Sequence, residues 1–246
     1  MPRHHASDSL RPISVQCGFI SSRPASVLYS SGRTRVLCVA TLEEGVPTFL
    51  LGRGRGWATA EYDILPGATL PRHQRERGGK VSGRTQEIQR LIGRSLRAVL
   101  DLEALDGFTL RFDCDVLEAD GGTRTAAISG AYIAGVLAAR AALRDGRLAR
   151  DPFTSAVAAV SAGMVEGRPY LDLDYEEDSS ADVDLNLVLD RSLHVLEIQA
   201  TAETRPLARA DLDQLIDLAT RGIEQIFVVQ ERAIETTGGA GLNRDR

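Results

Sequence analysis

The 246-residue sequence predicts an α+β fold, and three observations lead to this class. Short runs rich in β-branched and apolar residues, typical of strands, occur in consecutive groups. Long stretches with apolar residues at three- and four-residue steps, typical of helices, occur singly between those groups. Strands and helices therefore do not alternate regularly, as they would in a parallel α/β protein.

The first predicted elements are three strands between residues 13 and 42, with the sequences ISVQCGFI, ASVLYSSG and TRVLCVAT. The segment GWATAEYDIL at 56–65 is predicted to be a further strand. Residues 66–85 contain two prolines, four glycines and a cluster of basic residues. They are predicted to form an exposed loop.

The strongest helix signal covers residues 84–105, where apolar residues follow a helical period and Gly107 provides a stop. Residues 108–117 alternate apolar and polar side chains, which predicts a half-buried strand. An Ala- and Gly-rich stretch at about 124–145 predicts a second helix, packed closely against its neighbours.

Two hairpins and a last helix complete the prediction. AVAAVSAGMV and RPYLDLDY would form one hairpin, joined at Glu166-Gly167. DVDLNLVL and LHVLEIQAT would form the other, turned at Asp190-Arg191. Residues 208–235 are predicted to be a helix, because their apolar residues again follow the helical period.

We expect a single domain over residues 11–235, between flexible ends at 1–10 and 236–246. No apolar run approaches the ~18–20 residues that a membrane helix needs. The first residues, MPRHHASDSLRP, lack the apolar segment of a secretory signal. Three widely spaced cysteines argue against a disulfide framework and for a reducing environment. These features favour a cytoplasmic protein without a membrane partner.

The basic residues exclude some functions, since Lys80 is the only lysine among 29 lysines and arginines. Val81 follows it, so the Gly-Lys-Ser/Thr of a P-loop is missing and a P-loop nucleoside triphosphatase is excluded. Four histidines leave little material for a histidine-rich metal site or a Ser-His-Asp triad. The net charge of −5 disfavours nucleic-acid binding over the whole surface, but it allows a local arginine patch.

The sequence DGGTRT at 120–125 lies between a predicted strand and a predicted helix. Its glycines free the backbone, the helix N-terminus adds partial positive charge, and Thr123 and Arg124 add a hydroxyl and a guanidinium. This combination can form a phosphate cradle. A helix-terminus interaction is worth only ~0.3–2 kcal/mol, so a cradle alone would bind weakly. An ordinary glycine turn with a threonine cap is an equally good interpretation of these six residues.

An acidic run extends over residues 172–184. In a strand from 182, Asp182, Asp184 and Asn186 share one face, and Asp178 lies in the turn just upstream. Clustered carboxylates suit Mg²⁺ that bridges to phosphate, and close carboxylates raise the pKa of one another, so that one could be a general acid. On charge alone, a solvated acidic edge that prevents strand pairing is the better interpretation.

Basic residues gather in the predicted loop and could bind an RNA backbone, although a solvated loop is the simpler interpretation. Arg84 differs from the others, because it opens the predicted helix and its planar guanidinium could bind phosphate through two hydrogen bonds. The basic residues of this segment are Arg72, His73, Arg75, Arg77, Lys80 and Arg84.

Taken together, these segments resemble the bacterial ribonuclease PH family of phosphate-dependent 3′ exoribonucleases, from about Arg11 to about Gln230. The resemblance rests on five blocks in the right order: VLCVATLEEGVPTFL, GWATAEYDILPGAT, GRTQEIQRLIGRSLRAV, DCDVLEADGGTRTAAISGAY, and DYEEDSSADVDLNLV followed by EIQATAE. It implies two β-sheet-plus-helix halves related by a pseudo-twofold duplication, and a homo-oligomeric ring, a hexamer built as a trimer of dimers. It also implies removal of nucleotides after the CCA end of precursor tRNA, with inorganic phosphate as co-substrate and nucleoside diphosphates as products.

Carried over by motif, the resemblance assigns the catalytic carboxylates to Asp178 and Asp184. They would hold Mg²⁺ or protonate the leaving 3′ oxygen. The same groups would serve the reverse reaction, nucleotide addition. The residues that the resemblance assigns to phosphate binding are Arg84, Gly122, Thr123 and Arg124.

The family's arginine loop for the tRNA stem falls on Arg72, Arg75 and Arg77. One alternative function is a non-catalytic ring subunit that binds RNA within an exosome-like assembly, and another is a Mg²⁺-dependent hydrolytic nuclease. A scaffold does not need both halves of the site, and a hydrolase has no use for a second phosphate cradle. Phosphorolysis is therefore the favoured interpretation.

The sequence departs from the family in the segment that reads QATAETRPL at 199–207. Ala200 and Thr204 replace two expected glycines, and Leu207 replaces an aromatic residue. Glycine permits positive φ and close backbone approach, so these changes bear on substrate fit or local packing.

Overall fold

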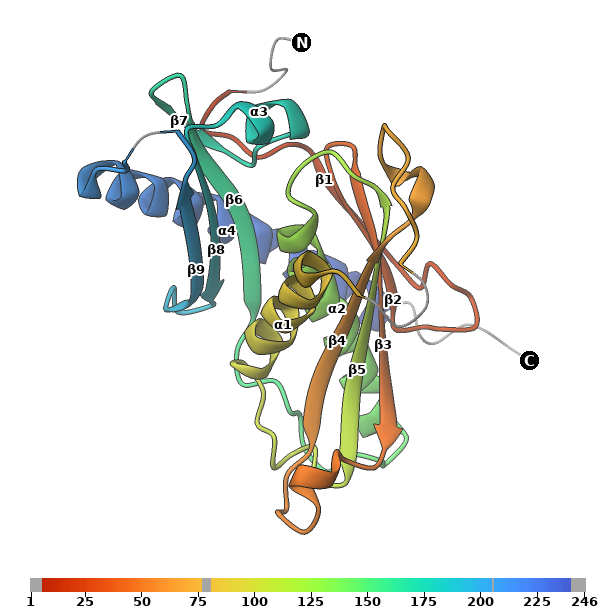
Figure 1. The fold of residues 1–246 in the computed structure, drawn as a ribbon. Coiled ribbons are helices and arrows are strands. Elements are labelled where there is room, and N and C mark those ends of the chain that lie inside the picture. The colour runs from red at the N-terminus through yellow and green to blue at the C-terminus, as the bar shows by residue number, and fades with distance from the viewer. Residues whose placement is uncertain (1–5, 77–80, 205, 240–246) are drawn as a thin grey trace.

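Two β-sheets and four α-helices form the computed structural model, which describes residues 6–76, 81–204 and 206–239 (Figure 1). The first sheet has the order β1 (Ile13–Cys17), β2 (Ser26–Ser31), β3 (Thr34–Glu44), β5 (Phe108–Glu118), β4 (Trp57–Ile64). The second has the order β7 (Arg168–Leu171), β6 (Val157–Val165), β8 (Val183–Asp190), β9 (Val195–Ala202). All pairs are antiparallel except β4 with β5, so the α+β prediction is confirmed.

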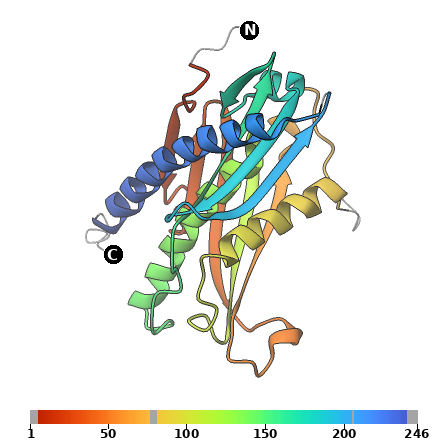
Figure 2. The same ribbon diagram turned by 90° about the vertical axis from the view of Figure 1, so that its left-hand side faces the viewer.

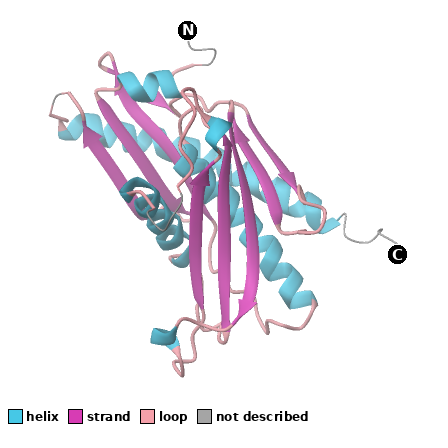
Figure 3. Cartoon of the chain, turned by 45° about the vertical axis from the view of Figure 1, so that its right-hand side comes forward, coloured by secondary structure: helices cyan, strands magenta, loops and turns pink. Residues whose placement is uncertain are grey.

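The helices are α1 (Gly83–Arg97), α2 (Thr123–Arg144), α3 (Tyr175–Ser180) and α4 (Arg209–Gly239), with short 3₁₀ turns at Thr48–Leu50 and Pro66–Ala68. The two sheets lie side by side (Figure 3). α2 contacts both β3 of the first sheet and β6 of the second, and α1 packs beside it on β4. α4 lies along the outer face of the second sheet (Figure 2).

The main hydrophobic core joins the two halves of the chain. It contains the inner face of the first sheet, α1 and α2, together with Val157, Ala159 and Val188 of the second sheet and Ile234 of α4. A second core lies between the second sheet and α4. The two sheets therefore share the main core, which fixes the position of one sheet relative to the other.

The predicted helix at 84–105 is too long, because α1 ends at Arg97. The Asp101 carboxylate accepts hydrogen bonds from the backbone N–H groups of Glu103 and Ala104, at 2.9 and 3.3 Å, which favours a turn over a helix. Leu100 forms a bridge with Phe153 instead of continuing the helix. The apolar period survives beyond Arg97 because its residues are buried in this turn.

The chain also contains a short helix, α3, where the sequence suggested only a turn. Asp174 accepts a hydrogen bond of 2.9 Å from the backbone N–H of Glu177, and the Glu177 side chain accepts one of 3.1 Å from the backbone N–H of Asp174. This reciprocal capping box starts the helix. The last helix, α4, is longer than predicted, because it extends to Gly239 and not to residue 235.

One helix, α2, comes closer to the length and composition of a membrane helix than was expected from the sequence. Thr123–Arg144 is long and apolar enough to pass a test of length and composition, but 83% of the tested window is buried inside the fold. Its Ala- and Gly-rich sequence serves close packing between the sheets. For example, a Cβ atom at Gly130 would lie 2.8 Å from the Cys38 sulfur and 2.9 Å from the Tyr29 Cβ. α2 is thus the central, buried helix of the fold.

Candidate active site

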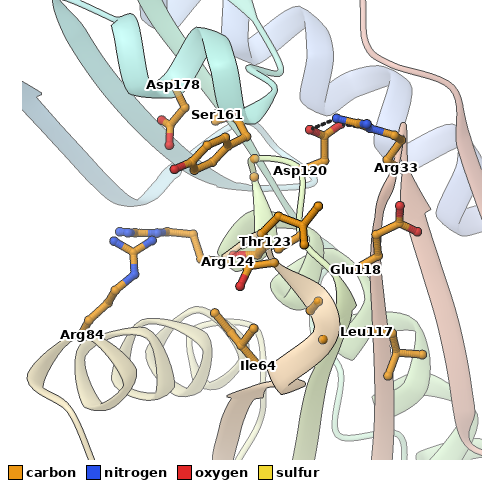
Figure 4. Close-up of a pocket in the computed structure, with 18 of the residues that line it drawn as sticks. Arg33, Ile64, Arg84, Leu117, Glu118, Asp120, Thr123, Arg124, Ser161 and Asp178 are labelled. Carbon is orange, nitrogen blue, oxygen red and sulfur yellow. Dashed lines mark hydrogen bonds and ion pairs between the residues drawn. The ribbon is translucent and has the colours of Figure 1, made fainter. Parts of the chain in front are cut away.

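A cavity of about 750 Å³ is lined by residues from both halves of the chain. Its walls come from the loop after β4, the start of α1, the end of β5, the start of α2, α3, and the strands β6 and β8 (Figure 4). The structure brings into this cavity all of the residues predicted to bind phosphate or to act in catalysis. These are Arg84, Gly122, Thr123, Arg124, Asp178 and Asp184.

Two glycines shape the loop that starts α2. Gly121 and Gly122 have φ angles of 77° and 64°, in the left-handed region that favours glycine. A Cβ atom at Gly121 would collide with the carbonyl oxygen of Leu173. The tight turn directs the N-terminus of α2, with its free N–H groups and partial positive charge, at the cavity.

Thr34 and Arg11 stabilise the glycine loop through hydrogen bonds to its backbone. The Thr34 hydroxyl donates to the Gly121 carbonyl at 2.6 Å and accepts from the Asp120 N–H at 2.9 Å. Arg11 donates to the Asp120 carbonyl, and its guanidinium lies 2.7 Å from the carboxylate of Asp172. Both ends of the Arg11–Asp172 pair are buried, so the loop has a rigid support.

Thr123 is positioned by Tyr62 of β4. The buried Tyr62 hydroxyl donates a hydrogen bond of 2.8 Å to the Thr123 hydroxyl oxygen, and burial raises the pKa of Tyr62, which keeps it a donor. Because the Thr123 oxygen accepts this bond, its own hydrogen is available to a ligand in the cavity.

Arg124 is held by two residues that the sequence interpretation missed, Gln199 of β9 and Glu87 of α1. The Arg124 guanidinium donates to the Gln199 side-chain oxygen at 3.1 Å and lies 3.7 Å from the Glu87 carboxylate. The Gln199 amide donates to Glu87 at 2.7 Å. Both residues stand in the blocks GRTQEIQR and EIQATAE, but neither strand nor helix periodicity indicates that they meet.

Arg84 is the second residue of α1, which Ser82 caps by accepting a hydrogen bond of 3.1 Å from the Thr85 N–H. The guanidinium groups of Arg84 and Arg124 point toward the same part of the cavity, and Asp178 lies across from them (Figure 4). Two positive charges that converge in this way are suited to a polyanion such as phosphate.

Asp178 on α3 and Asp184 on β8 form the acidic side of the cavity. Along β8, Leu185 and Leu187 are buried in the core against α4, which leaves Asp184 and Asn186 on the cavity face. The Asn186 amide lies 3.2 and 3.3 Å from the two Asp184 carboxylate oxygens. Burial, and then the charge of Asp178, raise the pKa of Asp184 to about 6. Burial also raises the pKa of Asp178, although Arg124 and Arg84 oppose the change.

The two carboxylates fit Mg²⁺ by their chemistry. Mg²⁺ is commonly held by one or two carboxylates and completed by waters and substrate phosphate oxygens. A bound cation would favour the ionised carboxylate and would therefore lower the pKa of Asp184, against the effects of burial and of Asp178. Over residues 6–76, 81–204 and 206–239 there is no group of three or more His, Cys, Asp or Glu side chains arranged for a metal, so protein ligands alone would not form a complete site.

Arg72 and Arg75, two of the predicted RNA-binding arginines, do not line the cavity. Leu70 and Pro71 line the cavity, whereas Arg72 and Arg75 follow them on the exposed surface. Arg77 lies outside the described residues. The structure therefore places Arg72 directly after the cavity residue Pro71, and it places Arg75 within electrostatic range of Asp115, which lines a separate pocket.

The departures at Ala200, Thr204 and Leu207 fit the fold. In the described part of the chain, neither Ala200 nor Thr204 is among the residues with positive φ, so neither position requires glycine. The Thr204 hydroxyl donates a hydrogen bond of 2.6 Å to the Asp182 carboxylate, and Leu207 packs against the core beneath α4.

Comparison with known sequences identifies relatives over most of the chain. The model of the 3′ exoribonuclease family, domain 1, matches residues 9–149, and that of domain 2 matches residues 155–222. Ribonuclease PH of Syntrophomonas wolfei subsp. wolfei is 50% identical over 231 residues, which are 94% of this chain and 97% of the relative. Ribonuclease PH of Trichormus variabilis is 52% identical over 225 residues, which are 92% of this chain and 91% of the relative.

Comparison with solved structures identifies proteins that share the fold of this chain. The crystal structure of rice Rrp46 superposes with a TM-score of 0.75 over 94% of this chain and 98% of that chain. The identity is only 17%, so this similarity concerns the fold alone.

Proposed function

The chain belongs to the 3′ exoribonuclease family and is a phosphorolytic exoribonuclease of the ribonuclease PH type, and from this premise we propose that its cavity is the active site. One observation carries the proposal: two arginines, a glycine loop at a helix N-terminus and two aspartates, distant in the sequence, line one cavity. The substrate is the 3′ end of precursor tRNA and of other RNA.

We propose that inorganic phosphate is bound by Arg84, Thr123 and Arg124 and by the backbone N–H groups that follow Gly122. A phosphate oxygen attacks the phosphorus of the terminal nucleotide, and a new P–O bond forms. The bond from that phosphorus to the 3′ oxygen of the preceding nucleotide breaks, and the 3′ oxygen takes up a proton. The products are a nucleoside diphosphate and an RNA one nucleotide shorter. Positioning and neutralisation of charge provide the rate acceleration.

Asp178 and Asp184 are the residues that would hold Mg²⁺. When bound, the cation would neutralise negative charge on the phosphate groups. The alternative role for Asp184, without a cation beside it, is to hold a proton for the leaving 3′ oxygen, because burial and the charge of Asp178 raise its pKa to about 6. The Asn186 side-chain amide orients the Asp184 carboxylate.

We propose that Arg72 and Arg75, together with Arg77, contact the RNA backbone upstream of the reacting end. Support comes from the exposure of Arg72 and Arg75, and from the position of Arg72 directly after the cavity residues Leu70 and Pro71. Such contacts would add affinity without reading sequence.

We further propose that the protein acts in the cytoplasm as a homo-oligomeric ring, a hexamer built as a trimer of dimers, and that residues 11–235 act as a single domain. The shared hydrophobic core and the cavity lined by both halves support the single domain. The alternative function, a non-catalytic RNA-binding ring subunit, would not require the two arginines and two aspartates to meet in one cavity.

The test is to incubate the protein and its Asp184→Asn variant with a 3′-extended tRNA and Mg²⁺, with and without inorganic phosphate. We expect phosphate-dependent release of nucleoside diphosphates by the unmodified protein alone. Nucleoside monophosphates in the absence of phosphate would instead assign a hydrolase. RNA binding without any released nucleotide would assign the scaffold function.

A further inference from the structure

Ser161 of β6 has a buried hydroxyl for which the described residues provide no hydrogen-bond partner. The residue is only 3% exposed, yet it lines the active-site cavity (Figure 4). A buried hydroxyl without a partner loses its hydrogen bonds to water and gains nothing in return. Such a group in a cavity is a candidate for contact with a ligand.

The packing around Ser161 does not by itself require a hydroxyl. Ala158, Val160 and Ala162 of β6 point into the core beneath α4. Val157 and Ala159 share the opposite face with Ser161 and belong to the main core. An alanine at 161 would continue this apolar face. The hydroxyl is therefore the one feature of this side chain that the fold leaves unexplained.

The neighbours of Ser161 place it between the two halves of the catalytic machinery. In the register of β6 with β8, Ser161 lies opposite Asn186, on the face that carries Asp184. The Asn186 amide is already directed at the Asp184 carboxylate. Figure 4 shows Ser161 on the same wall as Asp178, above Thr123 and Arg124. A phosphoryl group in the cradle would thus approach a donor with no other partner.

We propose that Ser161 is a further substrate-binding residue, whose hydroxyl donates a hydrogen bond to a phosphoryl oxygen in the cavity. This inference rests on the proposed function, because it takes the cavity to be the site of phosphorolysis. The phosphoryl oxygen belongs either to inorganic phosphate or to the terminal phosphodiester of the RNA. In both cases Ser161 adds a neutral donor on the side of the aspartates, where an arginine would instead form an ion pair with them.

The experiment compares Ser161→Ala with the unmodified protein and with Ser192→Ala, a control serine in the exposed turn between β8 and β9. Two readouts are used: the KM values for phosphate and for a 3′-extended tRNA, and the rise of the melting temperature with added inorganic phosphate. Ser161→Thr, which keeps the hydroxyl, tests rescue.

If Ser161 binds inorganic phosphate, Ser161→Ala needs roughly ten-fold more phosphate in both readouts, equivalent to about 1.4 kcal/mol. Its melting temperature without phosphate is unchanged or higher, since an unpaired buried hydroxyl has been removed. If the partner is the terminal phosphodiester, kcat/KM for the tRNA falls roughly ten-fold while the phosphate-induced shift is unchanged. Ser161→Thr recovers part of the loss in either case.

Unchanged kinetics and an unchanged phosphate shift would overturn the proposal. So would an effect confined to the Mg²⁺ requirement or to the pH profile, because Ser161 would then act through Asp184. If the unmodified protein released no nucleotide but bound phosphate in a Ser161-dependent way, the proposed function would fail and Ser161 would remain an anion ligand.

Discussion

Gln199, at the edge of the second sheet, accepts a hydrogen bond of 3.1 Å from Arg124, at the start of the central helix. The bond joins the two halves of the chain at the cavity. Gln199 also donates to Glu87 of α1 at 2.7 Å, so one amide sets the distance between a cradle arginine and its counter-ion. Arg124 is thereby oriented by Gln199 while it keeps a longer ion pair of 3.7 Å with Glu87.

Removing this amide tests its positioning role. In Gln199→Ala, Arg124 loses its acceptor and moves toward Glu87. We expect the KM for phosphate to rise about three- to ten-fold, in line with roughly 1 kcal/mol for one hydrogen bond, and kcat to change little. Steady-state kinetics at varied phosphate checks this. Gln225→Ala on the outer helix α4 is the control, and equal KM values in the two variants would contradict the assignment.

Arg124 itself is expected to contribute more. Arg124→Ala removes a charge-assisted contact, so the phosphate concentration for half-maximal rate should rise roughly 10- to 150-fold, the equivalent of about 1.5–3 kcal/mol. Arg221→Ala removes the same charge from the exposed side of α4 and should leave this value unaltered. The cradle would be misassigned if Arg124→Ala changed only the affinity for RNA.

Asp184→Asn is expected to abolish turnover while leaving RNA binding nearly intact. It should also stabilise the protein in buffer free of Mg²⁺ and phosphate. The pKa of Asp184 rises from 3.8 to about 6 on folding, so its ionisation opposes folding above pH 6, and this penalty disappears below pH 4. At about 1.4 kcal/mol per pKa unit, we expect the free energy of unfolding to rise by about 1–3 kcal/mol at pH 8.

Urea unfolding of Asp184→Asn and of the unmodified protein at pH 8 and at pH 4 measures the predicted change in the free energy of unfolding. The gain should be present at the higher pH and absent at the lower one, where the native carboxyl is already protonated. A variant that is less stable at pH 8 would show that the native site favours the ionised form. Near-normal turnover would remove Asp184 from the mechanism.

The Arg11–Asp172 pair is expected to be the most costly to break. Both side chains are 5% exposed, so Arg11→Met leaves the Asp172 carboxylate buried without its cation. We expect the free energy of unfolding to fall by about 3–5 kcal/mol. Arg33→Ala breaks the pair with Asp120, in which the arginine is 75% exposed, and should have a much smaller effect. Equal losses in urea unfolding would show that the burial of Arg11 is unimportant.

Much of this architecture could be predicted from the sequence, because local patterns carry it. The alternation along β8 correctly separates Asp184 and Asn186 from the buried leucines, and the two glycines before Thr123 correctly mark a turn into a helix. The resemblance to a family then assigned Arg84, the loop at 122–124 and the two aspartates to one site, which no local pattern indicates.

The residues that were missed interact over long distances in the chain. Gln199 and Glu87 are separated by 112 positions, and Arg11 and Asp172 by 161, and no periodicity encodes such pairs. The missing hydrogen-bond partner of the Ser161 hydroxyl could not be predicted either, because it depends on which atoms surround Ser161 in the folded chain. The misplaced end of α1 has a local cause, the competing turn formed by the Asp101 carboxylate.

The division of the cavity between two distant parts of the chain has a consequence for biosynthesis. A nascent chain that has left the ribosome only as far as the end of α2 already carries Arg84 and Arg124, but neither Asp178, Asp184 nor Gln199. On the proposed assignment of the site, such a chain holds only part of the catalytic groups, so an incomplete translation product is expected to release no nucleotide.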